Sequence, residues 1–502
     1  LDDTTVAAAD LNALDDETSG AINASSVTML TGTASAVATA YASSGIIGLG
    51  NAAVTLSVGT VAATDLYAID LATSGNIYAG SVTTLTGSLS YVADVYASFE
   101  IFGLGVADVT LDDATVRADS LFELDTLTIG TIDASSVTTL SGALSAVSMA
   151  YILSGISGLG DEAVTLDDTT VAASDLLALD ALTTGVIDAS SVTTLTGSLS
   201  DVADVYASVG IVGLAAADVT LDDTTVAASD VNALDTATNG MIDASSVTTF
   251  TGSLSDADVL YASGGIAGPI WTAAWTLSDT TVAASDLNNL EVTTYGIVDA
   301  SSVTALTGSL SDVAAAYASS GISGLGNEAV TLSDTTVAAA DLNALDAKTT
   351  GVIDASSVTT LTGGVSAIRT TYLSAQSGGI SGLGNEAVTL SDTTLPAVAL
   401  VAIDGYTSGT VDASAALTLS GSLSYLAAAY ASSGITGLGN EAVTLNNSTV
   451  AAADLNALDM ATSGTINASS VTTLTGSLSA VATAYASSGI SGLGNAAVTL
   501  SD

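Results

Sequence analysis

The sequence predicts an α/β solenoid, a right-handed stack of about eighteen coils that each contain one strand and one short helix. Three observations predict this fold class: a 55-residue repeat, short strands with alternating apolar residues, and alanine-rich segments with helical spacing. A fixed period of this length indicates units that bury their apolar faces against their neighbours. The repeat is clearest in nine of the fifteen tyrosines, which form one column: Tyr41, Tyr96, Tyr151, Tyr206, Tyr261, Tyr317, Tyr372, Tyr430 and Tyr485.

The strands are predicted from alternation and β-branched residues. Each repeat has two related halves, and each half begins with glycine and carries a short Val/Thr/Leu segment. In the first half, Val330 and Leu332 are expected on one face of the strand, with Thr331 and Ser333 on the other. In the second half, Leu361 is expected to point inward between two threonines.

The helices are predicted from the alanine-rich segment that follows each strand. Two examples of the expected buried stripe are Leu89, Val92 and Tyr96, and Ala7, Leu11 and Leu14. Asp, Ser or Thr before each segment and Gly after it are typical helix boundaries. Because a strand–helix–strand connection within one sheet is almost always right-handed, repeating it coils the chain. The alternative is an all-β solenoid, but alanine favours helices over strands.

The predicted domain organisation is simple. We expect residues 1–502 to form a single continuous solenoid of nine 55-residue repeats, open at both ends. Residues 1–3 (LDD) are equivalent to residues 500–502 (LSD), and neither end has the polar cap typical of solenoids. We therefore expect a part of a longer array, or a subunit that associates end to end with copies of itself.

The composition excludes several classes of function. The chain has 52 acidic and three basic residues, so nucleic acid and anionic membranes are not expected partners. It has neither cysteine nor histidine, which excludes disulfides and histidine-ligated zinc. No apolar run is long enough for a membrane-spanning helix, and no signal peptide is recognisable. Because 48% of the residues are hydrophobic, the chain can still build a core.

Acidic residues form four columns along the repeats. The first column follows the first strand of each repeat, and it is the candidate Ca²⁺ site because hard cations prefer carboxylate, hydroxyl and carbonyl oxygens. The other interpretation of this column is helix capping. The column begins at Asp3, and its candidate metal ligands are Asp113, Asp168, Asp223, Asp279, Asp334 and Asp392. The second column, with Asp341 as an example, lies within the predicted helix, and the third column, with Asp346, ends that helix. The fourth column, with Asp354, is the aspartate of the motif I-D-A-S. For the helix-end column, a solvated charge and a contact with cations stay open.

Three further features suggest contacts rather than catalysis. Outward threonines in T-x-T spacing resemble an ice-binding face, although threonine is also an ordinary residue on a solvated strand. The tyrosine column is expected to pack against the core, with carbohydrate stacking as the alternative. Residues 268–275 (GPIWTAAW) interrupt the repeat and contain both tryptophans, Trp271 and Trp275. This segment is either a loop that makes contacts or neutral variation of the repeat. Without a histidine base beside a serine, no enzyme is expected.

The repeated words NEAVTLSDTTVAAADLNALD and IDASSVTTLTGSLS resemble the tandem repeats of very large secreted or cell-surface proteins of aquatic bacteria, including cyanobacteria. The resemblance covers the whole chain and implies an extracellular adhesin, fibre or surface-layer component. We therefore expect a structural extracellular protein that forms a rigid rod, filament or surface coat. The alternatives are a calcium-dependent adhesin arm that binds glycans or surfaces and, more remotely, an ice-binding solenoid.

Overall fold

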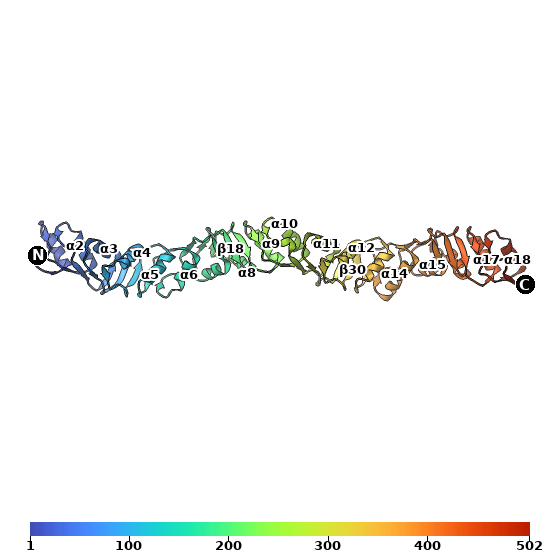
Figure 1. The fold of residues 1–502 in the computed structure, drawn as a ribbon, viewed down its shortest axis with the longest axis horizontal. Coiled ribbons are helices and arrows are strands. Elements are labelled where there is room, and N and C mark those ends of the chain that lie inside the picture. The colour runs from blue at the N-terminus through green and yellow to red at the C-terminus, as the bar shows by residue number, and fades with distance from the viewer. Residues whose placement is uncertain (502) are drawn as a thin grey trace. The chain divides into compact units, whose positions relative to one another are not determined.

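The computed structural model describes residues 1–501, which form helices alternating with short strands (Figure 1). These elements belong to two compact units: residues 1–247 with 262–269, and residues 248–261 with those from 270 onward. Both units repeat one strand-plus-helix coil, with parallel pairing between the strands of successive coils. The predicted α/β solenoid of about eighteen coils is therefore confirmed, and the all-β alternative is wrong.

One short helix belongs to each coil. The helices are, in chain order, α1 (Ala8–Glu17), α2 (Ala34–Ala42), α3 (Ala63–Ala72), α4 (Leu89–Ala97), α5 (Ala118–Asp125), α6 (Leu144–Ile152), α7 (Ala173–Asp180), α8 (Leu199–Ala207), α9 (Ala228–Ala237), α10 (Leu254–Ala262), α11 (Ala284–Thr293), α12 (Leu310–Ala318), α13 (Ala339–Asp346), α14 (Val365–Ser377), α15 (Ala397–Asp404), α16 (Leu423–Ala431), α17 (Ala452–Ala461) and α18 (Leu478–Ala486). A 3₁₀ turn, η1 (Ile270–Thr272), lies in the irregular loop.

The strands form parallel sheets, most of them five-stranded. A representative sheet of the first unit contains β16 (Thr170–Ala172), β18 (Thr194–Gly197), β20 (Asp218–Leu221), β22 (Ile242–Asp243) and β24 (Ile266–Ala267). Its counterpart in the second unit contains β31 (Thr336–Ala338), β33 (Thr360–Gly363), β35 (Ala387–Leu390), β37 (Val411–Asp412) and β39 (Ile435–Thr436). Paired residues such as Thr194 and Asp218 lie about 24 residues apart. Two such steps cover fewer residues than the 55-residue repeat. The paired strands therefore shift in position relative to the helices from coil to coil, and each sheet ends after a few strands.

Each sheet presents one buried apolar row to the core. The row across β16 to β24 consists of Val171, Leu195, Val219, Ile242 and Ile266, all of which are buried. The row on the opposite face consists of Ala172, Thr196, Thr220, Asp243 and Ala267. This row mixes threonine with alanine and aspartate, and a second outward row of the same sheet runs through Thr170, Thr194 and Asp218.

The helices bury a stripe that differs from the predicted one. In α7, the buried residues are Ala173, Leu176 and Leu179, which follow a step of three residues. In α1, the corresponding stripe starts at Ala8, because Ala7 ends the preceding strand. The predicted stripe of Ala7, Leu11 and Leu14 is therefore wrong at its first member. Leu14 is also 44% exposed, whereas its equivalents are buried in inner coils.

Tyr96 also lies outside the stripe assigned to it. Within α4, Val92 and Val95 are buried, and the half-buried Tyr96 ring lies beside them. Its hydroxyl reaches the following loop, where it donates a hydrogen bond to the carbonyl oxygen of Leu104 at 3.2 Å. The tyrosine column therefore joins each of these helices to the loop after it.

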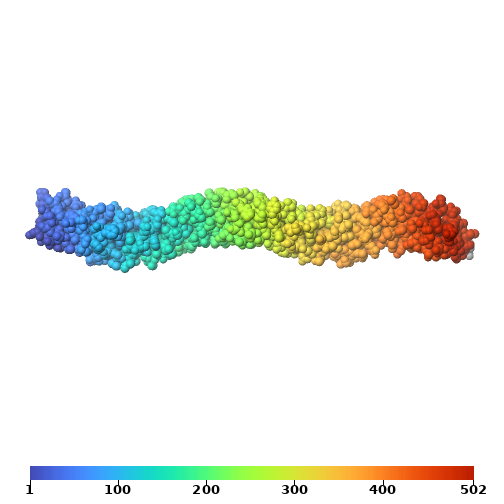
Figure 2. Space-filling model, in the orientation of Figure 1, coloured from blue at the N-terminus to red at the C-terminus, as the bar shows by residue number. Residues whose placement is uncertain are grey.

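Contacts within each unit are made mostly between neighbouring coils. In the space-filling view the colour changes gradually along each unit, so each stretch of chain lies against stretches close to it in sequence (Figure 2). Successive helices such as α2 and α3, and paired strands such as β18 and β20, make these contacts. A polar group can therefore form hydrogen bonds either within its own coil or with an adjacent one.

Candidate functional site

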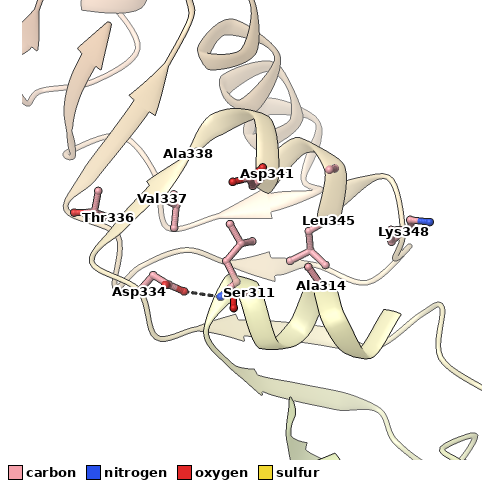
Figure 3. A pocket seen from close by; sticks show the side chains of 11 residues that line it. Ser311, Ala314, Asp334, Thr336, Val337, Ala338, Asp341, Leu345 and Lys348 are labelled. Carbon is pink, nitrogen blue, oxygen red and sulfur yellow. Dashed lines mark hydrogen bonds between the residues drawn. The ribbon is translucent and has the colours of Figure 1, made fainter. Parts of the chain in front are cut away.

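The first acidic column caps helices from the neighbouring coil. The carboxylate oxygen Oδ2 of Asp334 accepts a hydrogen bond of 2.6 Å from the backbone amide of Leu310, the first residue of α12 (Figure 3). All six candidate metal ligands form this bond, at 2.6–2.8 Å, with a helix that begins 24 to 27 residues earlier. The pairs are Asp113 with Leu89, Asp168 with Leu144, Asp223 with Leu199, Asp279 with Leu254, Asp334 with Leu310, and Asp392 with Val365.

The cap belongs to a different helix from the one that follows the aspartate in sequence. The helix after Asp334 is α13, whose N-cap residue Ala338 makes no side-chain cap bond. By contrast, α12 is capped twice, because the hydroxyl of Ser309 also accepts from the amide of Asp312. An aspartate at this position stabilises the helix by pairing an otherwise orphan amide and by placing negative charge at its positive end.

The first and second acidic columns meet in a groove between consecutive helices. In the groove between α12 and α13, of about 350 Å³, Asp334 and Asp341 line the wall with Ser311 and Thr336 (Figure 3). Lys348 lies at the same groove. An equivalent groove in the first unit contains Asp168 and Asp175. Within residues 1–501, however, no group of three or more acidic side chains is close enough to hold a metal ion.

The third acidic column is tied to serines of the next coil. The carboxylate of Asp180, at the end of α7, accepts a hydrogen bond of 2.9 Å from the hydroxyl of Ser208, and that hydroxyl accepts from the amide of Gly210. A Cβ atom on Gly210 would lie 2.2 Å from the Asp180 carboxylate, which explains the glycine. The same carboxylate–serine bond joins Asp15 to Ser43, Asp70 to Ser98, Asp235 to Ser263, Glu291 to Ser319, Asp346 to Ser374, Asp404 to Ser432 and Asp459 to Ser487.

The fourth acidic column forms a local turn. Oδ1 of Asp133 accepts a hydrogen bond from the amide of Ser135 at 3.0 Å, and the same bond recurs in the other I-D-A-S motifs. Hydrogen bonds from the Ser135 hydroxyl and amide lower the pKa of Asp133. An aspartate that bonds to the amide two residues later is a common turn device, so this column shapes the loop after its strand.

Four buried glutamates are the polar residues that the sequence did not single out. Glu162, Glu328, Glu386 and Glu441 are at most 2% exposed. In each case the carboxylate accepts hydrogen bonds from the hydroxyl of the column tyrosine and from a loop glycine amide. The signal that could have found them is that this position carries Glu in four repeats and Ala in the other five.

These glutamates act on the tyrosines beside them. Burial, together with the negative charge of Glu162, raises the pKa of Tyr151 to about 12. Burial and the hydrogen bond to Glu328 likewise raise the pKa of Tyr317. The phenols therefore stay protonated and can donate hydrogen bonds to the glutamate carboxylates. These hydrogen bonds offset the free energy that burying a charged carboxylate costs.

The irregular loop builds an aromatic cluster in the second unit. Trp275 is fully buried, stacks on Phe250 at a centroid distance of 5.5 Å, and donates from Nε1 to the Tyr261 hydroxyl at 2.7 Å. Trp271 stacks on the Tyr261 ring at a centroid distance of 4.7 Å, but its side chain is 44% exposed. Tyr295, which is 85% exposed, donates its backbone amide to the Trp271 carbonyl. The loop thus combines a core anchor with an exposed aromatic surface.

The comparisons with known proteins give no further assignment. No family model matches the sequence, and no curated protein is significantly similar to it. In residues 1–501, none of the helices has the length and apolar character that a membrane-spanning helix needs.

Proposed function

We propose that this chain is a structural, extracellular repeat protein that forms a rigid rod, filament or surface coat. The observation that carries the proposal is the use of the acidic columns. The carboxylates of the first and third columns bond to the neighbouring coil, as in the pairs Asp334–Leu310 and Asp180–Ser208. Because these carboxylates form hydrogen bonds between coils, they stabilise the stack and do not form a localised binding site. The resemblance to tandem repeats of large secreted proteins supports the extracellular location.

The expected partner is a further coil of the same kind. Strand β45 (Ala497–Leu500) pairs with β43 (Thr473–Gly476). Its residues Val498 and Leu500 are 45% and 50% exposed, whereas the equivalent Val443 is buried. We propose end-to-end association with a second copy or with more of the same chain, because the same parallel strand pairing recurs from coil to coil. The grooves contain neither histidine nor cysteine, which supports a function without catalysis.

Electron microscopy and small-angle scattering of the purified chain test the structural proposal. We expect elongated particles at low concentration and end-to-end filaments at high concentration. Compact particles at all concentrations would contradict the proposal. Substituting Val498 and Leu500 by Asp should abolish filaments and leave the single particles unchanged, whereas the same change at the exposed Val58 should have no effect.

A calcium-dependent adhesin arm is the second candidate, and two observations favour it. The grooves bring together two carboxylates and two hydroxyls, a donor set suited to Ca²⁺. Trp271 and Tyr295 present exposed aromatic surface, the kind of surface on which sugar rings stack. Thermal unfolding with excess Ca²⁺ and with chelator tests the first point, because ligands bound only to the folded chain raise its melting temperature. Sedimentation with insoluble neutral polysaccharides, before and after Trp271→Ala, tests the second.

A further inference from the structure

Two tyrosines meet between neighbouring helices of the first unit. Tyr67 lies on α3 and Tyr91 on α4, and their ring centroids are 5.6 Å apart with an angle of 59° between the ring planes. The Tyr91 side chain is 40% exposed, and Tyr67 is half-buried. Two phenols are therefore in ring contact at a place that solvent and small solutes can reach.

The pair replaces a hydrogen bond with which other coils join successive helices. In regular coils the two positions carry Asn and Ala. Asn343 donates from Nδ2 to the carbonyl oxygen of Ala367, 24 residues later, at 2.9 Å, and the same bond recurs near both ends of the chain. Tyr67 and Tyr91 are likewise 24 residues apart. The tyrosines thus lie at a regular point of contact between coils.

Other tyrosine contacts lack this combination of ring contact and exposure. Tyr372 and Tyr406 have ring centroids 5.3 Å apart, but Tyr372 is only 3% exposed and its hydroxyl donates to Glu386. Tyr78 packs against Phe102, which has no hydroxyl. The column tyrosines recur only on every second coil. Among the tyrosines in residues 1–501, only the pair on α3 and α4 brings two phenols into contact with neither ring buried.

Two phenols in contact are the reactants of oxidative coupling. A one-electron oxidant removes the hydroxyl hydrogen atom of each phenol and leaves two tyrosyl radicals. The radicals combine through ring carbons ortho to the oxygens, and the hydrogen on each of these carbons then moves to the oxygen, which restores both phenols. Overall, two C–H bonds break and one C–C bond forms, and hydrogen peroxide takes up the two electrons and two protons as two water molecules. Because the rings are held together, coupling within the chain is favoured over coupling between chains.

We propose that Tyr67 and Tyr91 are a modification site, at which a peroxidase with hydrogen peroxide forms a dityrosine that joins α3 covalently to α4. The chain has no cysteine, so disulfides cannot join its coils. The dityrosine closes a loop between positions 24 residues apart and restricts the unfolded chain, as a disulfide does. The biological use of this bond rests on the extracellular location proposed above, whereas the reaction itself depends only on the pair.

Oxidation of the purified full chain with peroxidase and hydrogen peroxide tests the proposal. A protease that cleaves before aspartate separates residues 65–69, which contain Tyr67, from residues 70–93, which contain Tyr91. We expect these two peptides as one product that is two hydrogen atoms lighter than their sum and has the fluorescence of dityrosine. Its yield should not change when the protein is diluted before oxidation, because the reaction occurs within one chain.

Phenylalanine variants identify the phenols that react. Tyr67→Phe and Tyr91→Phe should each lower the yield by about tenfold or more, whereas Tyr78→Phe, in the same peptide as Tyr91, should leave it unchanged. The chain also supplies a matched control. Tyr425 is 44% exposed at the position equivalent to Tyr91, but Val401 occupies the position equivalent to Tyr67. The natural chain should therefore form no such product at Tyr425, and Val401→Tyr should create one between α15 and α16.

Hydrogen exchange provides a second readout. In the oxidised chain, the amides of α3 and α4 should exchange more slowly, while those of α7 and α8 should not change. An absent product, a yield that falls on dilution, or a yield that survives Tyr67→Phe would overturn the proposal. Failure of the structural function gives a different result, because a chain that forms no filaments but yields the product within one chain still supports the modification site.

Discussion

The carboxylate of Asp334 lies 2.6 Å from the backbone amide of Leu310, and so one coil caps the helix of the coil before it. The bond spans 24 residues of sequence, the same step as the strand pairing. It therefore depends on correct stacking of the coils and reports on it. The repeat in which Val58 replaces this aspartate provides a natural contrast, because α2 has the cap from its own Thr33 without a carboxylate cap from the next coil.

Removing this cap should loosen one helix. We expect Asp334→Ala to destabilise α12 by about 1 kcal/mol, the usual value for a helix cap, measured by hydrogen exchange of the first-turn amides. Asp334→Asn should retain most of the bond, because Asn447 caps Leu423 at the same distance elsewhere in the chain. Asp341→Ala, in the same groove, is the matched control and should leave α12 unchanged. An equal loss in the control would contradict the capping role.

The missing serine beside Asp125 offers a gain-of-stability prediction. Leu153 occupies the position at which most other coils place the serine that binds the helix-end carboxylate. Leu153→Ser should add that bond and stabilise the coil by roughly 0.5–1.5 kcal/mol, since the hydroxyl can also accept from the Gly155 amide. The measurement is the protection of the Gly155 amide, with Ser208→Ala as the reverse control. Unchanged protection at Gly155 would mean that the carboxylate–serine bond adds nothing.

The raised pKa of Tyr151 predicts a loss of stability in alkali. The unfolded chain ionises this phenol near pH 10, whereas the folded chain keeps its proton up to about pH 12. The stabilisation is therefore complete below pH 10 and disappears as the pH rises through about 12. Tyr151→Phe should cost about 1–3 kcal/mol at pH 7, because the buried Glu162 loses a donor. Urea unfolding should show this difference shrinking between pH 10 and pH 12, while Tyr295→Phe, at an exposed position, should have no effect at either pH.

The aromatic cluster should be replaceable by the core of the regular coils. Trp275→Ala should cost about 3–5 kcal/mol, because it empties a fully buried site. The residue that is Val in α8 and α12 is Ala257 in α10, and we infer that the smaller side chain gives room to the rings. The triple variant Phe250→Leu, Ala257→Val, Trp275→Val should therefore recover most of the stability in urea unfolding. Trp271→Ala, at the exposed ring, should cost only about 1 kcal/mol.

If the triple variant does not recover stability, the aromatic cluster does more than fill the volume of the core. If it unfolds as readily as Trp275→Ala, the rings are required by the irregular loop and not by core volume. The bond from Trp275 Nε1 to the Tyr261 hydroxyl would then be the feature to remove alone, by Tyr261→Phe.

The pattern of apolar residues was sufficient to predict the coil. Alternation placed Val330, Leu332 and Leu361 in the core, and all three are buried. Alanine-rich spacing predicted the helices, although the stripe begins at Ala8 and not at Ala7. These features depend on the local periods of strands and helices, which any single repeat displays.

The partners of the polar groups could not be predicted in the same way. The sequence by itself determined the 55-residue period, the strand and helix segments and the residues that face the core, because those follow from side-chain periodicity within a few turns of chain. Only the tertiary structure decided that Asp334 caps α12 and that the buried Glu328 carboxylate accepts a hydrogen bond from the Tyr317 hydroxyl. The reason is geometric: strands pair at a step of about 24 residues, shorter than one coil, and this offset sets which polar atoms of successive coils come within hydrogen-bonding distance.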